Sequence, residues 1–234
     1  MLRVGTATAV GARPVNEDAL CADRGVYVVA DGMGGHDAGE VAARVAVEVV
    51  RGAQDSTPTA AQAAELLRRA HAAVRAVPSA ALRRPGTTLT GLLLGERGGE
   101  PCWLVVNVGD SRTYRWADGT LTRLTRDHSE VAELVERGLL PPEAAHRHPR
   151  RHVVTRVLGG GAADVEPDVT MLPVRSGDRL LVCSDGLTDE LTDPQIAAVL
   201  AAQPEPQPAA DALVAGALDA GGSDNVTVVV VDVG

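Results

Sequence analysis

The sequence predicts an α+β fold in which mainly antiparallel sheets carry helices on their outer faces. Short apolar runs typical of strands outnumber the helical segments, and tight turns join the central runs directly. Ala117, Asp118 and Gly119, for example, form a turn between two such runs. A parallel sheet needs a long crossover between neighbouring strands, and the central part of the chain offers none. The helices are therefore expected outside the sheets.

The predicted elements follow one another without an internal repeat or a linker, so we expect one domain over residues 1–234. The first strand is predicted at residues 26–30 and ends abruptly at Asp31. Two helices are expected at residues 40–52 and 59–77, because Val, Leu and Ala recur there every three or four residues. The next elements are strands at 87–94, 103–108, 113–116 and 121–124 and a short helix at 129–138.

The C-terminal half begins with a long segment that lacks regular periodicity. Residues 139–168 are rich in Pro, Gly, His and Arg, which indicates an irregular and often functional loop. Beyond it we expect a strand at 179–184, helices at 194–202 and 209–220 separated by the break PEPQP, and a buried strand at 226–233. Because aromatic residues make up only 2% of the chain and Phe is absent, the core must consist of Val, Leu and Ala.

Charge and composition exclude several classes of protein. The formal net charge is −9, which disfavours broad binding to nucleic acids or anionic membranes. The N-terminal residues contain no apolar signal segment, and no apolar run is long enough to cross a membrane. Three cysteines, Cys21, Cys102 and Cys183, lie far apart and form no CxxC motif, as expected of free thiols in a reducing compartment. We therefore expect a cytoplasmic protein, acting as a monomer.

Acidic residues recur where apolar runs end. Asp31, Asp110 and Asp185 each follow such a run, and Asp224 precedes the last one. A single Asp-Gly pair is typical of a turn. Four of them at strand ends can meet in one cleft, where carboxylates repel one another unless cations neutralise them. Ligands that are all oxygen atoms favour Mg²⁺, Mn²⁺ or Ca²⁺ over Zn²⁺.

The glycine-rich run after Asp31 matches none of the common ligand-binding loops. Met33 and Gly35 stand where an EF-hand loop needs Asp or Asn, and the run lacks the GK[ST] of a phosphate-binding loop. It also departs from GxGxxG, because Asp37 stands at the last position. Glycine at position 32 is better explained by the close approach of a backbone carbonyl to a metal ion.

Six motifs together carry a resemblance to a known family. They are Arg13-x-x-x-Glu17-Asp18, Asp31-Gly-Met-Gly-Gly-His-x-Ala-Gly-Glu40, Gly86-Thr-Thr-Leu-Thr90, Val108-Gly-Asp-Ser-Arg112, Cys183-Ser-Asp-Gly-Leu187 and Asp224-Asn-Val-Thr-Val228. In this order they resemble the metal-dependent type 2C serine/threonine protein phosphatases, in their compact bacterial form. The resemblance runs from about Arg13 to the C-terminus. It implies a four-layer αββα sandwich of two mainly antiparallel sheets.

The resemblance also implies a metal centre with two Mn²⁺ or Mg²⁺ ions that activate a bridging water. Asp31, Asp185 and Asp224 would be the catalytic ligands. Asp31 would bridge the two ions, and the carbonyl of Gly32 would join the second. Asp185 and Asp224 would hold the first ion. Asp110 would share a third, weaker ion with Asp185.

Further residues are assigned roles around that centre by the same resemblance. Arg13 would bind the substrate phosphate, to which its planar guanidinium is suited. Glu17, Asp18 and Asn225 would hold the ligands or metal-bound water in place. Members of the family from eukaryotes have a histidine, proposed as the general acid, where this chain has Met33. The leaving group would then be protonated by a metal-bound water or, as the lesser option, by His36.

The expected activity is hydrolysis of phosphoserine and phosphothreonine in proteins, opposing bacterial serine/threonine kinases. The expected partners are phosphorylated proteins, among them such kinases and their substrates. One alternative is a pseudophosphatase that binds phosphoproteins without turnover, although the metal positions are intact. Another is a partner-regulated phosphatase of an anti-sigma antagonist, for which no sensor domain is present. The basic residues 146–152 fit either a flap that attracts phosphorylated substrate or a solvated loop.

Overall fold

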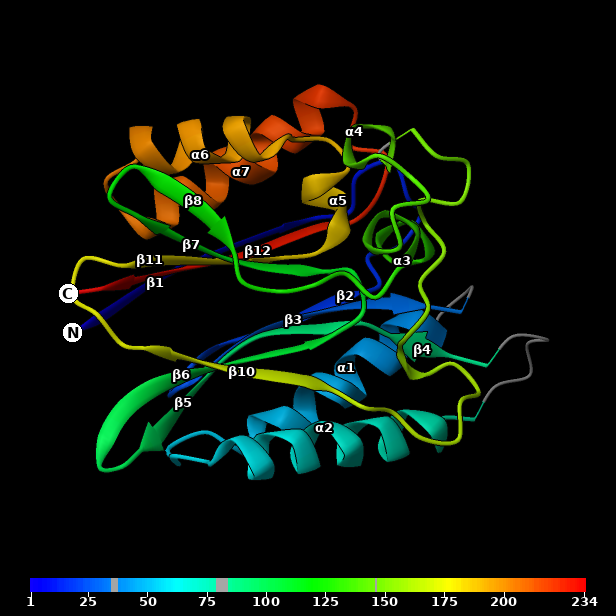
Figure 1. The fold of residues 1–234 in the computed structure, drawn as a ribbon, viewed down its shortest axis with the longest axis horizontal. Coiled ribbons are helices and arrows are strands. Elements are labelled where there is room, and N and C mark those ends of the chain that lie inside the picture. The colour runs from blue at the N-terminus through cyan, green and yellow to red at the C-terminus, as the bar shows by residue number, and fades with distance from the viewer. Residues whose placement is uncertain (35–37, 79–83, 146) are drawn as a thin grey trace.

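Two sheets lie face to face with helices on their outer sides (Figure 1). This is a computed structural model, and it describes residues 1–34, 38–78, 84–145 and 147–234. The five-stranded sheet has the order β1-β12-β11-β7-β8, formed by β1 (Leu2–Ala9), β12 (Val226–Val233), β11 (Arg179–Cys183), β7 (Arg112–Ala117) and β8 (Thr120–Arg123). Its neighbouring strands are all antiparallel.

The second sheet has seven strands in the order β10-β6-β5-β3-β4-β9, with β2 paired to β3. They are β10 (Asp168–Pro173), β6 (Glu100–Val108), β5 (Leu89–Arg97), β3 (Val26–Met33), β4 (Gly86–Thr87), β9 (Leu158–Gly159) and β2 (Asp18–Asp23). Every pairing in it is antiparallel as well. The predicted α+β class and the four-layer αββα sandwich are confirmed.

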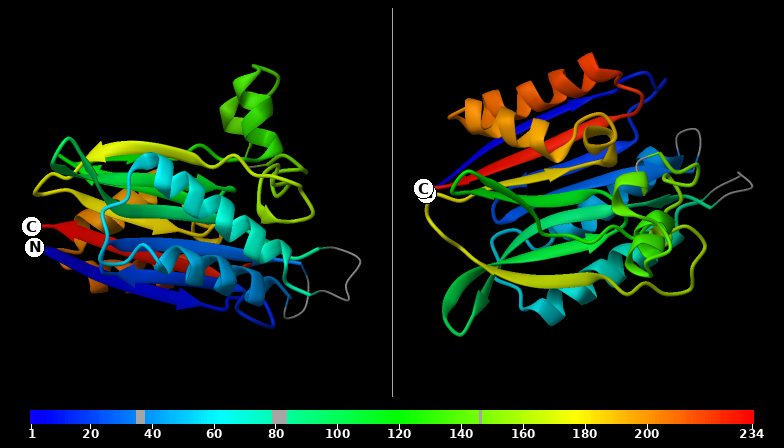
Figure 2. Two further views of the ribbon diagram at one scale, coloured as in Figure 1. Left: turned by 90° about the horizontal axis from the view of Figure 1, so that it is seen from below. Right: turned by 45° about the horizontal axis from the view of Figure 1, so that its top comes forward.

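The outer layers are two pairs of helices. The first pair, α1 (Ala38–Arg51) and α2 (Ala60–Arg75), covers the seven-stranded sheet. The second pair, α6 (Asp193–Ala202) and α7 (Pro206–Ala220), covers the five-stranded sheet. Three short helices, α3 (Glu130–Glu136), α4 (Pro142–Ala145) and α5 (Asp185–Thr188), lie at one end of the sandwich (Figure 2). No helix among the described residues is long and apolar enough to cross a membrane.

Strand β12 shows why the sequence packs in four layers. All eight of its residues are buried, and its apolar side chains alternate between the two sides of the sheet. Val229 and Val231 contact the facing sheet, whereas Val228 and Val230 contact the helical layer. Each sheet is therefore apolar on both faces. The aromatic residue Trp103 fills the space between the sheets, fully buried against Tyr27.

Several elements were not predicted from the sequence. The strands β1, β2 and β10 lie in stretches with many small or polar residues. β1 and β10 also pair with strands that are distant in the chain, whereas β2 pairs with the next strand, β3. The edge strand β1 forms because β12 pairs with it over its whole length. Helix α7 begins inside the predicted break, at Pro206, a position where the first turn of a helix tolerates proline.

Candidate metal centre and its surroundings

The acidic residues predicted from the strand ends meet at the end of the sandwich that carries α5. Asp31 lies in β3, Asp110 follows β6, and Asp185 begins α5 directly after β11. Asp31 and Asp185 lie close enough for their carboxyl groups to interact electrostatically. Asp224 precedes β12 and contributes its charge to the same cluster. The two sheets thus bring together four acids that lie up to 193 positions apart in the chain.

Burial and mutual repulsion raise the pKa values of these acids. Burial raises the pKa of Asp31 well above its usual range, and the charges of Asp185 and Asp18 add to the effect. Burial also raises the pKa of Asp110, with Asp185 as the next cause. The pKa of Asp185 rises to about 6 and that of Asp18 to about 7, in both cases chiefly through burial. A cluster with this electrostatic profile is stabilised by cations.

Buried oxygen atoms without hydrogen-bond partners support the same conclusion. Among the residues that the structure describes, these atoms include Asp185 Oδ1, Asp18 Oδ1 and Glu17 Oε1. A buried acceptor without a partner costs free energy, and a divalent cation or its water ligands would satisfy it. The donor set consists of carboxylate oxygens, which suits Mg²⁺ or Mn²⁺. The residues present therefore fit a divalent metal centre.

A hydroxyl network fixes the backbone that carries Asp31. Thr88 Oγ1 accepts a hydrogen bond from Asp31 N (3.0 Å), and Thr88 N donates to Asp31 O (2.9 Å). Thr87 Oγ1 also donates to Asp31 O (2.8 Å). The Thr88 hydroxyl in turn contacts Ser111 Oγ (2.8 Å), next to Asp110. The motifs around residues 86–90 and 108–112 thus position the acid cluster, a role that the sequence did not reveal.

Glycine at position 32 is required by packing as well. A Cβ atom on Gly32 would collide with the carbonyl oxygen of Gly39, at the start of α1, and would lie 2.6 Å from the carbonyl oxygen of Glu17. Gly32 N donates a hydrogen bond to that same Glu17 oxygen (3.2 Å). Three backbone segments therefore meet at Gly32, whereas the predicted approach of its carbonyl to a metal ion stays a prediction.

Asn225 holds the loop that carries Arg13 and Glu17. Its Nδ2 donates to Val10 O (2.8 Å) and Val15 O (2.9 Å), and its Oδ1 accepts from Glu17 N (2.8 Å). These contacts use most of the hydrogen-bonding capacity of a buried amide. The N-terminal loop is thereby anchored to the residue next to Asp224.

Asp18 is held in a second, smaller network. Ser184 Oγ donates to Asp18 Oδ2 (2.9 Å) and accepts from Thr227 N (3.0 Å). Ser184 directly precedes Asp185, so this hydroxyl links Asp18 to the backbone at a proposed metal ligand. The three residues expected around the ligands, Glu17, Asp18 and Asn225, therefore all lie beside the acid cluster.

Arg13 lies at the rim of the cluster and pairs with one of its acids. Its guanidinium donates to Asp224 Oδ2 (2.6 Å), and its side chain is 53% exposed. Because the pair is open to solvent, it is a weak constraint on the arginine. The side chain is thus placed where it can exchange the carboxylate for another oxyanion.

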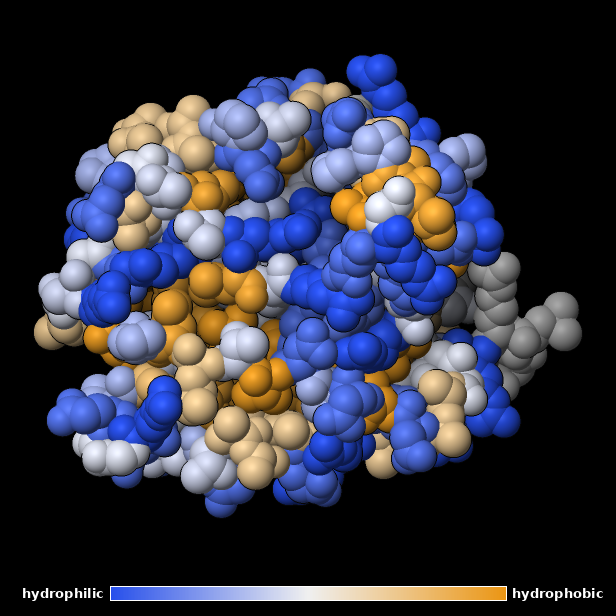
Figure 3. Space-filling view, in the orientation of Figure 1, coloured by the Kyte–Doolittle hydropathy of each residue, from blue (hydrophilic) through white to orange (hydrophobic). Residues whose placement is uncertain are grey.

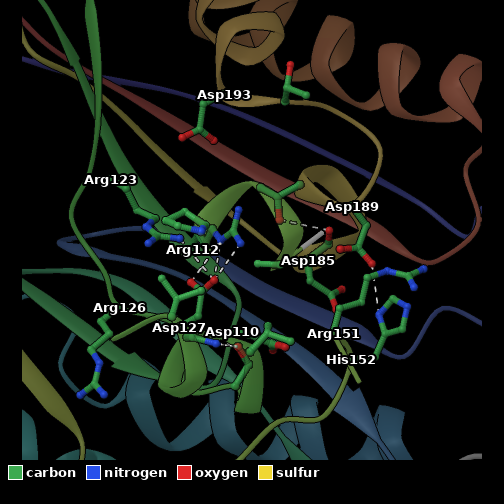
Figure 4. A pocket seen from close by; sticks show the side chains of 18 of the residues that line it. Asp110, Arg112, Arg123, Arg126, Asp127, Arg151, His152, Asp185, Asp189 and Asp193 are labelled. Carbon is green, nitrogen blue, oxygen red and sulfur yellow. Dashed lines mark hydrogen bonds and ion pairs between the residues drawn. The ribbon is translucent and has the colours of Figure 1, made fainter. Parts of the chain in front are cut away.

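A cavity of about 730 Å³ opens beside Asp110 and Asp185 (Figure 4). It runs between α3 and α5 toward Arg123 and Arg126, and Arg112 lies in it, paired with Asp127 (2.7 Å). Hydrophilic side chains gather on the surface over this end of the molecule, whereas apolar side chains show between the two sheets at the other end (Figure 3). The open side of the acid cluster is therefore polar and accessible.

The basic residues 147–152 lie next to this cavity, and His146 and His36 lie outside the described residues. Met33, at the position discussed for the general acid, ends β3 and pairs with Gly86 in the sheet. In the basic segment, His152 Nδ1 is 3.3 Å from Asp189 Oδ2, and Arg150 pairs with Glu130 (2.5 Å). The described part of this basic segment therefore contacts Glu130 of α3 through Arg150, and Asp189, which follows α5, through His152.

His128 is a buried histidine that contacts the loop before Asp110. Its Nδ1 accepts a hydrogen bond from Gly109 N (3.1 Å), and its Nε2 contacts Asp168 Oδ2 (3.2 Å). Burial lowers its pKa, and the charges of Arg156 and Arg126 add to this effect. The folded protein thus keeps the ring neutral where the unfolded chain already binds a proton.

We therefore expect the free energy of unfolding to decrease as the pH falls below about 6.5, the ordinary pKa of histidine. Above that pH both states keep His128 neutral and no stability is lost. Below it the unfolded chain takes up a proton that the folded protein binds less readily. Urea unfolding at about pH 7.5 and 5.5 should show a smaller loss of unfolding free energy in His128→Gln than in the wild type. Equal losses in the two proteins would contradict this role.

Comparison with known proteins identifies the family of this chain. The family model "Protein phosphatase 2C" matches residues 11–214. The serine/threonine protein phosphatase PstP of Mycobacterium tuberculosis (strain H37Rv) is 43% identical over 231 residues, 94% of this chain. The chain spans 43% of the length of that mycobacterial relative. The serine/threonine phosphatase stp of Listeria monocytogenes (strain EGD-e) is 35% identical over 88% of this chain and 84% of its own.

Solved structures agree over almost the entire chain. The serine/threonine phosphatase PstP/Ppp of M. tuberculosis matches with a TM-score of 0.91 and 40% identity, covering 99% of this chain and 98% of that one. A catalytic domain of PstP in complex with two manganese ions matches with a TM-score of 0.87 and 38% identity, over 99% and 97% of the two chains. With the family model covering most of its residues, this chain belongs to the protein phosphatase 2C family.

Proposed function

We propose that the chain is a metal-dependent protein phosphatase that hydrolyses phosphoserine and phosphothreonine in proteins. The observation that carries this proposal is the buried cluster of Asp31, Asp110 and Asp185, whose carboxylates repel one another. Asp185 Oδ1 in this cluster has no hydrogen-bond partner among the described residues. The names of the mycobacterial and listerial relatives support the substrate class. Since the acids proposed as ligands are all present, turnover is favoured over phosphoprotein binding alone.

Two divalent ions, Mn²⁺ or Mg²⁺, would be held by Asp31, Asp185, Asp224 and the carbonyl of Gly32. A third, weaker ion is proposed between Asp110 and Asp185. When bound, the ions supply an acidified water and offset negative charge on the phosphoryl group. The chain itself positions the proposed ligands. The Thr87 and Thr88 hydroxyls, for example, hold the backbone of Asp31.

Glu17, Asp18 and Asn225 are proposed to orient the ligands and their water. Asn225 holds Glu17 through its backbone N–H, and Ser184 holds one oxygen of Asp18. The other oxygen of Asp18 has no partner among the described residues, so it is free to accept a hydrogen bond from water. The side chain of Met33 carries no proton to donate, so it cannot protonate the leaving group.

The cellular role is proposed to be the reversal of serine/threonine kinases, with phosphorylated proteins, including such kinases, as partners. We propose that the protein acts as a monomer in the cytoplasm. Its three cysteines are free and buried, which suits a reducing compartment.

Removal of metal tests the proposed function directly. Chelation with EDTA followed by dialysis should abolish hydrolysis of a phosphothreonine peptide and of p-nitrophenyl phosphate, and Mn²⁺ or Mg²⁺ should restore both. The physical reason is that the buried acids cannot organise a nucleophile without cations. Full activity in exhaustively metal-free protein would refute the metal-dependent mechanism.

Arg13→Ala should separate phosphate binding from metal binding. Because the guanidinium would contact phosphate in both the bound substrate and the transition state, KM should rise more than kcat falls. The expected loss in kcat/KM corresponds to about 2–3 kcal/mol, the scale of a charge-assisted hydrogen bond. Steady-state kinetics on a phosphopeptide measure both constants. An unchanged KM would show that Arg13 does not bind the substrate phosphate and only pairs with Asp224.

A further inference from the structure

The two ends of the segment that borders the cavity meet at His128. This segment, residues 129–156 without position 146, supplies the cavity wall formed by α3 and α4. Ser129 and Val154, near its two ends, pair in a short antiparallel bridge. Thr155 N then donates a hydrogen bond to His128 O (2.8 Å). The backbone of His128 is therefore joined to one end of the segment by the chain itself and to the other by a hydrogen bond.

The side chain of His128 makes a contact through each of its ring nitrogens. Nδ1 accepts a hydrogen bond from Gly109 N (3.1 Å). Because a backbone N–H can only donate, the ring proton of the neutral imidazole lies on Nε2, where Asp168 Oδ2 (3.2 Å) accepts it. Arg156 Nη1, at the end of the segment, donates to the other oxygen of Asp168 (2.9 Å). The side chain of His128 is only 3% exposed, so its ring is held between these partners.

Gly109 carries Asp110 and is enclosed by three other residues. Its carbonyl oxygen accepts from Asn107 Nδ2 (3.2 Å) and from His128 N (2.9 Å). A Cβ atom on Gly109 would lie 2.6 Å from the Cβ atom of Thr88, so the backbone is packed tightly on that side. Asp110 is the next residue and lines the cavity (Figure 4). A rotation of the Gly109 peptide would therefore displace the Asp110 carboxylate.

We propose that His128 is a positioning residue that fixes the loop of Asp110 relative to the segment bordering the cavity. Its Nδ1 is the acceptor that the buried amide of Gly109 requires. Its Nε2 reaches Asp168 at the start of β10, which also holds the end of the segment through Arg156. The cavity wall that a phosphoprotein would contact is thereby tied to an acid of the cluster. The proposal rests on the proposed function, in which Asp110 serves hydrolysis, but the contact itself can be tested without activity.

Double-mutant kinetics test whether His128 acts through Asp110. At saturating Mn²⁺, His128→Ala should lower kcat for a phosphopeptide about tenfold and change KM less, as expected when a residue that holds a ligand is removed. In the Asp110→Asn background the same substitution should lower kcat by less than about twofold, because the acid that it positions is already absent. Equal losses in the two backgrounds would overturn the proposal.

His71→Ala is the matched control for these kinetics. His71 is also a buried histidine, 4% exposed, and its Nδ1 also accepts from a backbone amide, that of Gly159 (3.1 Å). It contacts β9 rather than the loop of Asp110. Any effect of His71→Ala on kcat should therefore be the same in the wild type and in Asp110→Asn.

Two conservative variants separate the roles of the ring nitrogens. Asparagine places an oxygen near the position of Nδ1 and can accept from Gly109 N, whereas glutamine places its amide near the position of Nε2. His128→Asn should therefore recover most of the kcat that His128→Ala loses, and His128→Gln should recover less. Recovery by glutamine that equals or exceeds recovery by asparagine would overturn the proposed contact with Gly109.

Hydrogen exchange tests the contact independently of hydrolysis. In metal-free protein the amide of Gly109, followed by NMR, should exchange about five- to tenfold faster in His128→Ala than in the wild type. His128→Asn should restore its protection, and His71→Ala should leave it unchanged. Unchanged protection of Gly109 in His128→Ala would overturn the proposal. If the wild type does not hydrolyse phosphopeptides with Mn²⁺, the proposed function fails, whereas this exchange rate still decides whether His128 holds the loop.

Discussion

Asp31→Asn is expected to lower kcat at least about 10²-fold, because the substitution removes a charge that would hold both catalytic ions. The backbone should keep its position, since its hydrogen bonds run to Thr87 and Thr88 rather than to the carboxylate. Kinetics with p-nitrophenyl phosphate and a phosphopeptide, at saturating Mn²⁺, measure the loss. Asp219→Asn, an exposed acid on α7, is the matched control and should retain full activity.

The same variant should become more stable without metal. In the metal-free protein Asp31 either repels Asp185 and Asp18 or is held protonated at a cost, and asparagine avoids both. Thermal unfolding in EDTA should therefore occur at a higher temperature than in the wild type, by about 2–4 °C per kcal/mol of relieved repulsion. Mn²⁺ should stabilise the wild type more than the variant. A variant that is less stable in EDTA would show that the carboxylates do not oppose one another.

Asp232→Ala should cause the largest loss of stability, on the order of 3–5 kcal/mol, because it leaves a buried guanidinium without its counter-charge. Arg179 is only 8% exposed. Its Nε and Nη2 donate to the two oxygens of Asp232, at 2.6 and 2.8 Å. Its remaining donors reach the carbonyls of Leu200, Gln203 and Pro204 at the C-terminal end of α6. One arginine thus joins two central strands to a helix.

Urea unfolding of a short series measures this contribution. Glu205→Gln is the control, because Glu205 pairs with Arg3 in an exposed contact, and it should change the unfolding free energy by no more than about 1 kcal/mol. The double variant Asp232→Leu with Arg179→Met should recover part of the loss, since it removes both charges. A loss below about 1 kcal/mol for Asp232→Ala would show that Arg179 finds enough compensation in the three carbonyls.

The sequence was sufficient to predict the acids of the cluster because each one interrupts an apolar run. Asp110 and Asp185 follow strands and Asp31 lies near the end of β3, which continues two residues beyond the predicted stop, to Met33. Two packed antiparallel sheets bring such ends together. It was insufficient for β1, whose small and polar residues become a strand only through pairing with β12. The difference is between a local signal, which sequence carries, and a contact between segments that are far apart in the chain.

The residues around the acid cluster also differ in whether a local sequence signal or a distant contact places them. Asn225 was expected beside the acids from its motif, but its contacts with Val10 and Val15 depend on how the N-terminal loop returns to β12. The contact between His152 and Asp189 had no signal in the sequence, because a histidine in a basic segment is typical of an exposed loop. Only the docking of that segment onto α5 brings the two together.

The position of β12 between β1 and β11 sets an order of events during synthesis on the ribosome (Figure 1). The first strand to emerge waits for the last one, since β12 is its only partner in the sheet among the described strands. Asp224 and Asn225, which complete the acid cluster and anchor the N-terminal loop, emerge just before β12. A nascent chain that has not yet released β12 therefore lacks the complete five-stranded sheet and the complete acid cluster, so the metal centre can form only after β12 has emerged.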